Sequence, residues 1–225
     1  MSARDDILAA IRRNLRRAPN DPAKIAAEAA ALAFESNESR PRLPDGDLAD
    51  AFAARLVSDK VVGASVERIA RLEETPAAVR RYCNAHGLDL TLALQPDPSL
   101  QQLDWSGFTV KSAIGADETL ALAKARWAIA ETGTFVFHSG PESPTLLSFL
   151  PLHHICIIER ERILPHLEDY ALKEAGARPP RNINLITGAS GTSDIEGRLV
   201  RGAHGPAFLH AIIIGPRASE AAQAP

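Results

Sequence analysis

Three polar loops carry the side chains best suited to chemistry in this sequence. The first loop spans residues 130–134, where Glu131 precedes Thr132, Gly133 and Thr134. A carboxylate at Glu131 could serve as base, nucleophile or hydrogen-bond acceptor. We expect this loop to follow a helix, whose carbonyl end disfavours negative charge by about 0.3–1 kcal/mol. Either Glu131 is held there to act on a ligand, or its charge is stabilised by a backbone N–H, an arginine or solvent.

The second loop, residues 187–197, follows an apolar stretch and is rich in small residues. Small residues let the backbone approach a ligand, and a helix beginning near Ser193 would direct free N–H groups at a phosphate or carboxylate. The structural alternative is a capping box, because Ser193 and Glu196 have its spacing. Asp194 would oppose an anion unless a cation intervened. The candidate ligand-binding residues here are Gly188, Ser190, Thr192, Ser193, Asp194 and Glu196.

The third loop, residues 202–206, contains His204 between glycines, with Gly205 next to it. A histidine with an unperturbed pKa near 6.5 could transfer a proton or bind an acceptor, although it could equally bond its own turn. Ser139 begins a further polar loop, residues 139–145, that could close over a ligand. The other histidines near strands are expected to be packed, and we predict no metal site.

Composition narrows the possible functions. Lys and Arg number 25 against 28 Asp and Glu, giving a formal charge of -3 that does not favour nucleic acid as a partner. Cys83 and Cys156 are too few for a disulfide framework, a four-cysteine zinc site or an all-cysteine iron–sulfur cluster. The sequence lacks the phosphate-loop, dinucleotide-binding and nucleophile-elbow motifs. No secretory signal or membrane span is apparent, so we expect a cytoplasmic protein.

The loops must be positioned by alternating strands and helices. The apolar and β-branched stretches predict strands at residues 60–66, 90–94, 108–113, 134–138, 155–159, 183–187 and 208–214. Helical patterns lie at residues 48–56, 76–85, 117–129 and 162–173. Two further helices are predicted before them, one beginning near Ser2 and one spanning about residues 23–34. The nearly continuous apolar strands indicate helices on both faces of a sheet.

This alternation predicts the α/β class: a three-layer α/β/α domain with a largely parallel sheet. We place an N-terminal helical segment and linker at residues 1–45, the α/β domain at 46–216 and a flexible tail at 217–225.

Six segments, taken together and in order, resemble those of the LUD domain family, specifically its lactate utilization protein C group. The matching segments are residues 130–134, 139–141, 150–154, 184–188, 192–196 and 202–206. The resemblance is dense from about Ala116 to Ile214. It implies a fold similar to the superfamily of glucosamine-6-phosphate isomerase, ribose-5-phosphate isomerase and CoA-transferase.

The resemblance also implies a role in bacterial oxidation of L-lactate to pyruvate, as one subunit beside two iron–sulfur proteins. With two cysteines, this chain is similar to the small subunit without clusters, with the iron–sulfur clusters expected in its partner subunits. In this reading the chain is an accessory subunit that binds partners through its N-terminal helices and a small anionic metabolite at its loops. The alternative is a free-standing enzyme acting on an acyl-CoA or a sugar phosphate, with Glu131 as nucleophile or base and the Thr192 turn holding the phosphate. The fold analogy alone supports that alternative.

Overall fold

The computed structural model describes residues 2–15, 21–35, 40–58, 63–193 and 197–216, in two units, Met1–Arg40 and Pro41–Pro225. The first unit contains helices α1 (Ala3–Leu15) and α2 (Pro22–Glu35), which confirms the two predicted N-terminal helices. In α1 the apolar side chains of Ile7, Ile11 and Leu15 remain 48–60% exposed. No helix in the described part of the chain combines the length and apolar character that a bilayer crossing requires.

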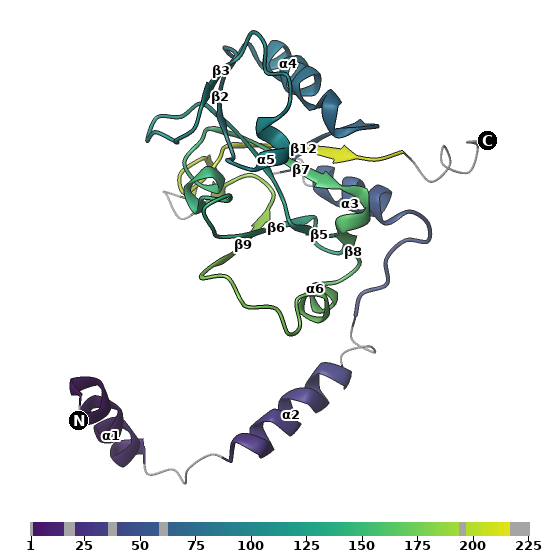
Figure 1. Cartoon of the computed structure of the whole chain (residues 1–225). Coiled ribbons are helices and arrows are strands. Elements are labelled where there is room, and N and C mark those ends of the chain that lie inside the picture. Colours follow the sequence, from purple (N-terminus) through teal and green to yellow (C-terminus); the bar gives the residue numbers. More distant parts are fainter. Residues whose placement is uncertain (1, 16–20, 36–39, 59–62, 194–196, 217–225) are drawn as a thin grey trace. The chain divides into compact units, whose positions relative to one another are not determined.

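The second unit is built on a six-stranded parallel sheet in the order β1-β12-β7-β4-β2-β3 (Figure 1). Every described pairing in this sheet is parallel, which confirms the predicted α/β class. Central strands β7 and β12 are almost wholly buried, as the continuous apolar runs predicted. The bounds of the six strands are β1 Ser65–Ile69, β2 Thr91–Leu94, β3 Thr109–Lys111, β4 Leu120–Lys124, β7 His153–Glu159 and β12 Phe208–Ile214.

One face of this main sheet is covered by helices. Helix α4 (Thr75–His86) and the short α5 (Pro98–Gln101) lie on it, with the 3₁₀ turn η1 (Leu72–Glu74) before α4. Their side chains and the sheet form one hydrophobic core, in which Ile155, Ile157 and Ile212 are fully buried. Burial of such side chains stabilises the fold by about 1.5–3 kcal/mol each.

The opposite face is covered by helix α3 (Leu48–Val57) and by a second sheet, rather than by helices alone as predicted (Figure 1). In the core between them, the rings of Phe52 and Phe135 meet edge to face with centroids 5.2 Å apart. Helix α6 (Leu167–Lys173) packs on the outer side of the second sheet through Tyr170. The second sheet has the order β8-β5-β6-β9, with β5 Trp127–Ile129, β6 Thr134–His138, β8 Ile163–Leu164 and β9 Ile183–Thr187.

Three of the predicted elements are wrong or misplaced. Residues 117–129 were expected to form a helix but form β4 and β5. The helix expected at 162–173 begins only at Leu167, after the 3₁₀ turn η3 (Arg160–Arg162) and β8, because a proline at position 165 disfavours helix before it. The first strand begins at Ser65, and residues 60–62 of its predicted range lie outside the described part. The remaining predicted strands and helices are confirmed to within a few residues.

The chain passes from the main sheet to the second sheet through two residues, Ala125 and Arg126. The backbone N–H of Ala125 donates to the carbonyl of Ile157 in the main sheet, at 2.8 Å. The next N–H, that of Arg126, donates to the carbonyl of Val136 in the second sheet, at 2.9 Å. Strands β4 and β5 therefore form one continuous path between the two sheets.

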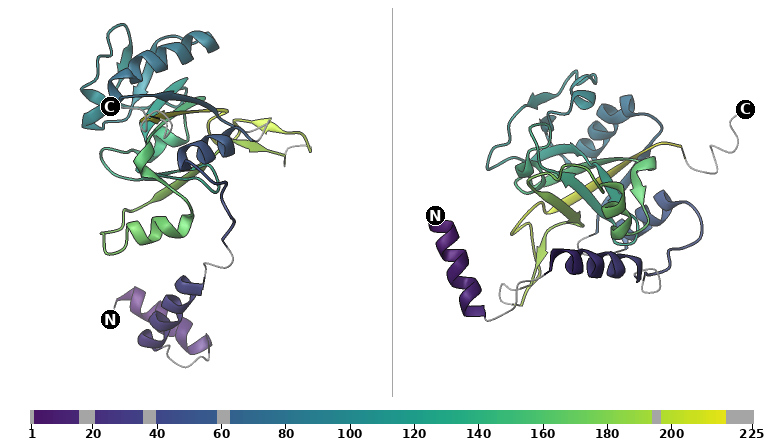
Figure 2. Two further views of the ribbon diagram at one scale, coloured as in Figure 1. Left: turned by 90° about the vertical axis from the view of Figure 1, so that its right-hand side faces the viewer. Right: turned by 60° about the horizontal axis from the view of Figure 1, so that its bottom comes forward.

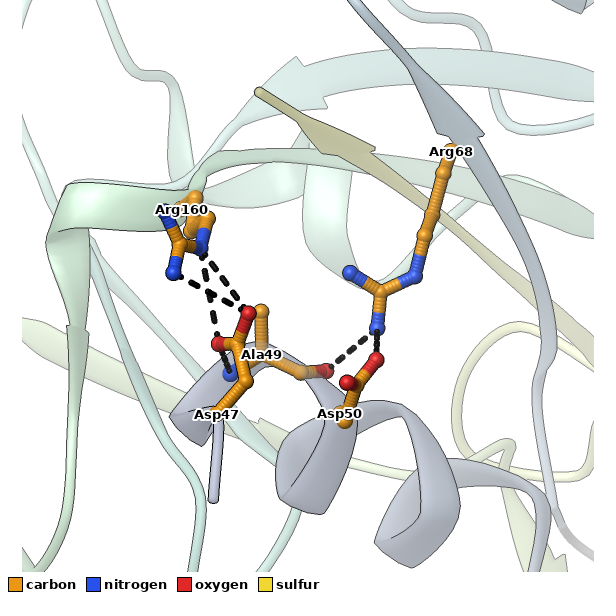
Figure 3. A network of polar contacts seen from close by, with 5 residues as sticks. All are labelled: Asp47, Ala49, Asp50, Arg68 and Arg160. Atoms are coloured by element: carbon orange, nitrogen blue, oxygen red, sulfur yellow. Dashed lines mark hydrogen bonds and ion pairs between the residues drawn. The ribbon is translucent and has the colours of Figure 1, made fainter. Parts of the chain in front are cut away.

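Helix α3 is fixed to the carboxyl ends of the main strands by two ion pairs (Figure 3). Asp47 caps the helix by accepting from the N–H of Ala49 at 2.8 Å, and it pairs with Arg160 at 3.0 Å. Arg68 donates to the carbonyl of Ala49 at 2.9 Å and pairs with Asp50 at 2.6 Å. The cap satisfies backbone groups at the start of the helix, and the arginines link it to β7 and β1.

Candidate functional site

A cavity of about 470 Å³ lies where β2, β4 and β7 end and the second sheet begins. We call it the carboxyl-edge cavity. Ligands of open α/β sheets bind beyond the carboxyl ends of the strands, so its position is the expected one for a site. Its polar side chains are those of Gln95, Asp97, Lys124, Arg126, His138, Ser139, Glu142, Ser143, Glu159 and Arg162.

The main sheet contributes an ion pair and an amide to this cavity. Lys124 ends β4, and its Nζ lies 2.7 Å from Oε1 of Glu159, which ends β7. Both side chains are partly buried, at 22% and 36% exposure. Gln95 follows β2, and its Oε1 accepts from the backbone N–H of Lys124. The sheet therefore presents fixed polar groups with little net charge.

Two guanidinium groups come from the residues directly before β5 and β8 of the second sheet, Arg126 and Arg162. Arg126 donates from Nε and Nη2 to the two carboxylate oxygens of Glu174, at 2.8 and 3.1 Å. The indole N–H of Trp127 donates to the same carboxylate at 2.6 Å. Arg162 lies over the ring of Trp127, with its guanidinium carbon 4.8 Å from the ring centroid. The hydrogen bonds from Arg126 and Trp127 hold the pKa of Glu174 down at about 2.

His138 brings an imidazole to the cavity wall at the end of β6. Its Nε2 lies 2.8 Å from the hydroxyl of Tyr170 on α6. Burial, and then the nearby Arg126, lower the pKa of His138 below its usual 6.5. The imidazole is therefore neutral near pH 7 and can both donate and accept hydrogen bonds.

Ser139 is the one predicted site residue, among those that the structure describes, that lines this cavity. Its N–H donates to the carbonyl of Asn182 at 2.9 Å, and its Oγ accepts from the N–H of Asn182 at 2.8 Å. The loop it begins folds back through paired hydrogen bonds between Gly140 and Ser143, at 3.2 and 3.1 Å. The polar loop expected to close over a ligand thus forms one wall of the cavity.

Glu131 does not occupy the position that the sequence suggested. It follows strand β5, not a helix, so the helix-dipole argument for its unfavourable placement is wrong. Its Oε2 lies 3.1 Å from Nδ1 of His166 at the start of α6, and both side chains are largely buried, at 24% and 14% exposure. The pair lies at the end of the second sheet opposite to the carboxyl-edge cavity.

The rest of the first loop makes a tight turn between β5 and β6. The hydroxyl of Thr134 lies 2.6 Å from those of both Thr132 and Thr187, which joins this turn to the end of β9. Gly133 has φ +70°, and a Cβ there would lie 3.3 Å from the backbone N of Leu56 in α3. Glycine is required by this close approach and by the left-handed backbone.

The second and third loops meet each other through Ser190. Its N–H donates to the carbonyl of Pro206 at 2.8 Å, and its carbonyl accepts from the N–H of Gly202 at 3.0 Å. The N–H of His204 lies 3.4 Å from its Oγ. A Cβ on Gly205 would lie 3.5 Å from the Cβ of Ser190. Hydrogen bonds thus connect the first loop to Thr187 of the second loop, and Ser190 of the second loop to the third loop.

Beyond Gly188, which has φ +73°, the second loop extends into a short antiparallel pair of strands. These are β10 (Gly191–Thr192) and β11 (Val200–Arg201), which project from the domain in Figure 2. Ser193 follows β10 and is exposed. Asp194 and Glu196, and with them the predicted helix start and capping box, lie outside the described residues.

His204 and Gly205 line a second cavity of about 530 Å³ at the amino ends of β4, β7 and β12. We call it the amino-edge cavity. Leu150 and Leu152 on its rim are 38% and 47% exposed. Its buried carboxylate, Glu118, is paired with Lys111 at 3.1 Å. The structure therefore places His204 and Ser139 in cavities at opposite edges of the main sheet.

Comparison with known proteins gives the family. The model of the LUD domain matches residues 109–214. The uncharacterized protein YkgG of Escherichia coli K12 is 30% identical over 208 residues, which cover 84% of this chain and 88% of that protein. The chain belongs to the LUD domain family.

Other LUD domain relatives match over shorter stretches. Lactate utilization protein C of Deinococcus radiodurans is 37% identical over 90 residues, covering 39% of this chain and 42% of that protein. The Exiguobacterium protein of the same name is 34% identical over 107 residues, covering 45% and 46%. The matched stretches thus span less than half the length of these two relatives.

A solved LUD-type structure supports the fold. The crystal structure of a DUF162 family protein from Deinococcus radiodurans superposes with a TM-score of 0.54 at 22% identity, covering 75% of this chain and 96% of that one. At this identity the likeness concerns the fold alone.

Sequence reasoning missed most of the carboxyl-edge cavity in this LUD domain. Arg126 and Glu174 are 48 positions apart, and Lys124 and Glu159 are 35 apart in the sequence. A usable signal was present, since Lys124 and Glu159 each end an apolar strand with a charge. In the described part of the chain no group of three or more His, Cys, Asp or Glu side chains is arranged to hold a metal ion.

Proposed function

We propose that this LUD domain chain acts in L-lactate utilization, as the subunit without iron–sulfur clusters beside cluster-bearing partners, and binds a small organic anion in the carboxyl-edge cavity. The observation that carries the proposal is its 34–37% identity, across the LUD region, to proteins named lactate utilization protein C. The part of the proposal that concerns partners rests on the sequence resemblance.

The two cysteines support the absence of a cluster from this chain. Cys83 lies in the core on the α4 side of the main sheet, and Cys156 in the core on the α3 side. Both are buried, and burial raises the pKa of each thiol. Cluster ligation requires thiolates that converge on one site, and these two are separated by the sheet.

The cavity supports an anionic ligand because it presents guanidinium, imidazole and amide groups in fixed positions. Arginine binds carboxylates with directional, charge-assisted hydrogen bonds. A neutral His138 can in addition bond to a hydroxyl or keto oxygen next to the carboxylate. These are the groups that distinguish a 2-hydroxy or 2-oxo acid from a simple carboxylate.

The alternative function, a free-standing enzyme with Glu131 as nucleophile or base, has less support. Glu131 lines neither of the two cavities described above, and its carboxylate is already engaged by His166. Turnover of an acyl-CoA or sugar phosphate by the isolated chain, abolished by Glu131→Gln, would restore this alternative.

The test combines growth with purification. Deletion of the coding sequence should prevent growth on L-lactate as sole carbon source and spare growth on pyruvate, with complementation restoring it. Tagged protein purified without oxygen should carry less than about 0.1 iron per chain after separation from its partners. Normal growth of the deletion strain on lactate would refute the proposed role, and stoichiometric iron in the separated chain would refute its cluster-free character.

A further inference from the structure

The charges around the carboxyl-edge cavity are almost all compensated within the protein. Three cationic side chains line it, and four carboxylates lie in or directly behind its wall. The cations are Lys124, Arg126 and Arg162, and the carboxylates are Asp97, Glu142, Glu159 and Glu174. With His138 neutral, these groups sum to 3 - 4 = -1.

Each compensated charge has a specific partner. Lys124 is paired with Glu159, and Arg126 is held side-on by both oxygens of Glu174. Asp97 caps α5 by accepting from the N–H of Ser99 at 2.8 Å. Glu142 is exposed in the loop that forms one wall. None of these groups offers an uncompensated positive charge to a ligand.

Arg162 differs from the other two cations. Among the described residues, no carboxylate lies within 4 Å of its guanidinium, which is the distance that defines the ion pairs reported above. Its contact is with the face of the Trp127 ring, an attraction of about 0.5–1 kcal/mol at an exposed site. The cavity therefore contains a single cation that a ligand could neutralise.

Glu174 controls this balance although it does not itself line the cavity. It follows the last residue of α6, where the helix dipole disfavours a carboxylate. Its side chain is nevertheless only 15% exposed, and its carboxylate accepts hydrogen bonds from Arg126 and Trp127. One carboxylate thus neutralises Arg126 and fixes the indole on which Arg162 rests.

We infer that the carboxyl-edge cavity selects anions with one negative charge, monocarboxylates above all, through Arg162, and that Glu174 sets this selectivity by neutralising Arg126. The inference rests on the proposed function in placing the ligand in this cavity. A dianion would bring a second negative charge, and the two other cations of the wall, Lys124 and Arg126, are already paired with carboxylates. Removal of the charge on Glu174 would release Arg126 and give the cavity a second free cation.

The experiment is a titration of the full chain at pH 7.5 and constant ionic strength, followed by NMR or calorimetry. The probes are L-lactate and pyruvate as monocarboxylates, and malonate and inorganic phosphate as anions that are mainly doubly charged. Wild-type protein should bind the monocarboxylates at least about fivefold more tightly. Equal or tighter binding of malonate and phosphate would overturn the inference.

Three variants separate charge from structure. Arg162→Gln should weaken monocarboxylate binding by about tenfold or more, since it removes the free cation. Glu174→Gln should strengthen malonate binding by about tenfold and so reverse the preference. Glu174→Asp keeps the charge and should keep the preference, even if both affinities fall. A purely structural role for Glu174 would instead weaken all probes alike in both Glu174 variants.

Matched controls change the same charges elsewhere. Glu73→Gln in η1 and Arg178→Gln after α6 alter exposed residues outside the cavity and should leave the preference within about twofold. If wild-type protein binds none of the four probes at millimolar concentration, the cavity assignment fails together with this inference. The growth experiment would still decide the role in lactate utilization, so the two failures are distinguishable.

Discussion

The carboxyl and amino edges of the main sheet differ in how their buried polar side chains are accommodated. At the carboxyl edge, acidic and basic side chains pair with one another, as Lys124 does with Glu159 and Arg160 with the buried Asp47. At the amino edge, His153, His154 and His210 have side chains that are almost fully buried. Burial lowers the pKa of all three, so that they stay neutral near pH 7.

The partners of the amino-edge histidines fit their neutral state. Nδ1 of His153 lies 2.8 Å from the hydroxyl of Tyr82, and Nδ1 of His210 lies 2.8 Å from that of Ser65. Hydroxyl partners compensate burial without adding charge. Partners, rather than water access, distinguish these groups: the buried carboxylates Asp47 and Glu118 are paired with cations, whereas His153 and His210 contact hydroxyl groups. One edge should therefore respond to pH, and the other to loss of an ion-pair partner.

The largest expected effect is acid destabilisation from the amino edge. The pKa of His154 and of His210 is about 4 in the folded protein against 6.5 when exposed, so only the unfolded chain gains protons between these values. Stability should be constant above about pH 7 and fall as the pH decreases from 6.5 to 4. At pH 5 the loss is roughly 2 kcal/mol per histidine. Urea unfolding at a series of pH values measures it.

Single variants sharpen this comparison. His154→Met removes one titrating group and should reduce the loss of stability between pH 7 and pH 5 by roughly a third to a half. His204→Gln changes an exposed histidine and should leave the pH dependence unaltered. If the free energy of unfolding of the wild type is constant from pH 7.5 to 5, the buried histidines do not make the amino edge sensitive to pH.

A smaller effect is expected from breaking an ion pair at the carboxyl edge. Arg160→Met removes the ion pair of Asp47, whose side chain is 6% exposed and also caps α3. Because loss of one partner of a buried ion pair is costly, the variant should lower the free energy of unfolding by about 2–3 kcal/mol at pH 7.5. Arg162→Met, two positions on, changes an exposed arginine whose contact is with the Trp127 ring and should cost under about 1 kcal/mol. Similar values for the two variants would mean that this edge does not depend on paired charges.

The smallest effect concerns Glu131, which belongs to neither edge of the main sheet. Glu131→Gln keeps a hydrogen-bonding group near His166 and removes one charge from a partly exposed pair. We expect a loss of about 0.3–1 kcal/mol in thermal or urea unfolding. This reverses the sign that a position after a helix implied. An increase in stability would show that the contact with His166 is unfavourable and would return Glu131 to the list of functional candidates.

Much of the fold could be predicted because most strands are buried on both faces and carry apolar runs. Strands β6 and β12 have the predicted bounds for this reason, and β9 has them although Ile183 and Leu185 on one of its faces are exposed. Residues 117–129 were wrongly predicted to form a helix because alanine, leucine and lysine have high helix propensity. Burial in two sheets overrides that propensity, since Leu120, Ala121 and Leu122 on successive positions are all almost fully buried.

The site was less predictable because its groups meet only through tertiary contacts. The reasoning applied to Glu131, a carboxylate poorly placed at the carbonyl end of a helix, describes Glu174 instead. That residue could be identified only after the real helix, α6, was known to end before it. The partners that compensate its charge, Arg126 and Trp127, lie in a region that the sequence assigned to the wrong secondary structure.

The two-residue passage from β4 to β5 limits how this chain can change in length. Successive N–H groups of Ala125 and Arg126 bond to different sheets, so the passage has no spare residue. Because side chains alternate along a strand, inserting or deleting one residue here would turn Trp127 and every later side chain of β5 to the opposite face. Length variation among homologues should therefore avoid positions 124–127 and accumulate between β10 and β11, where the described residues 193 and 197–199 are exposed.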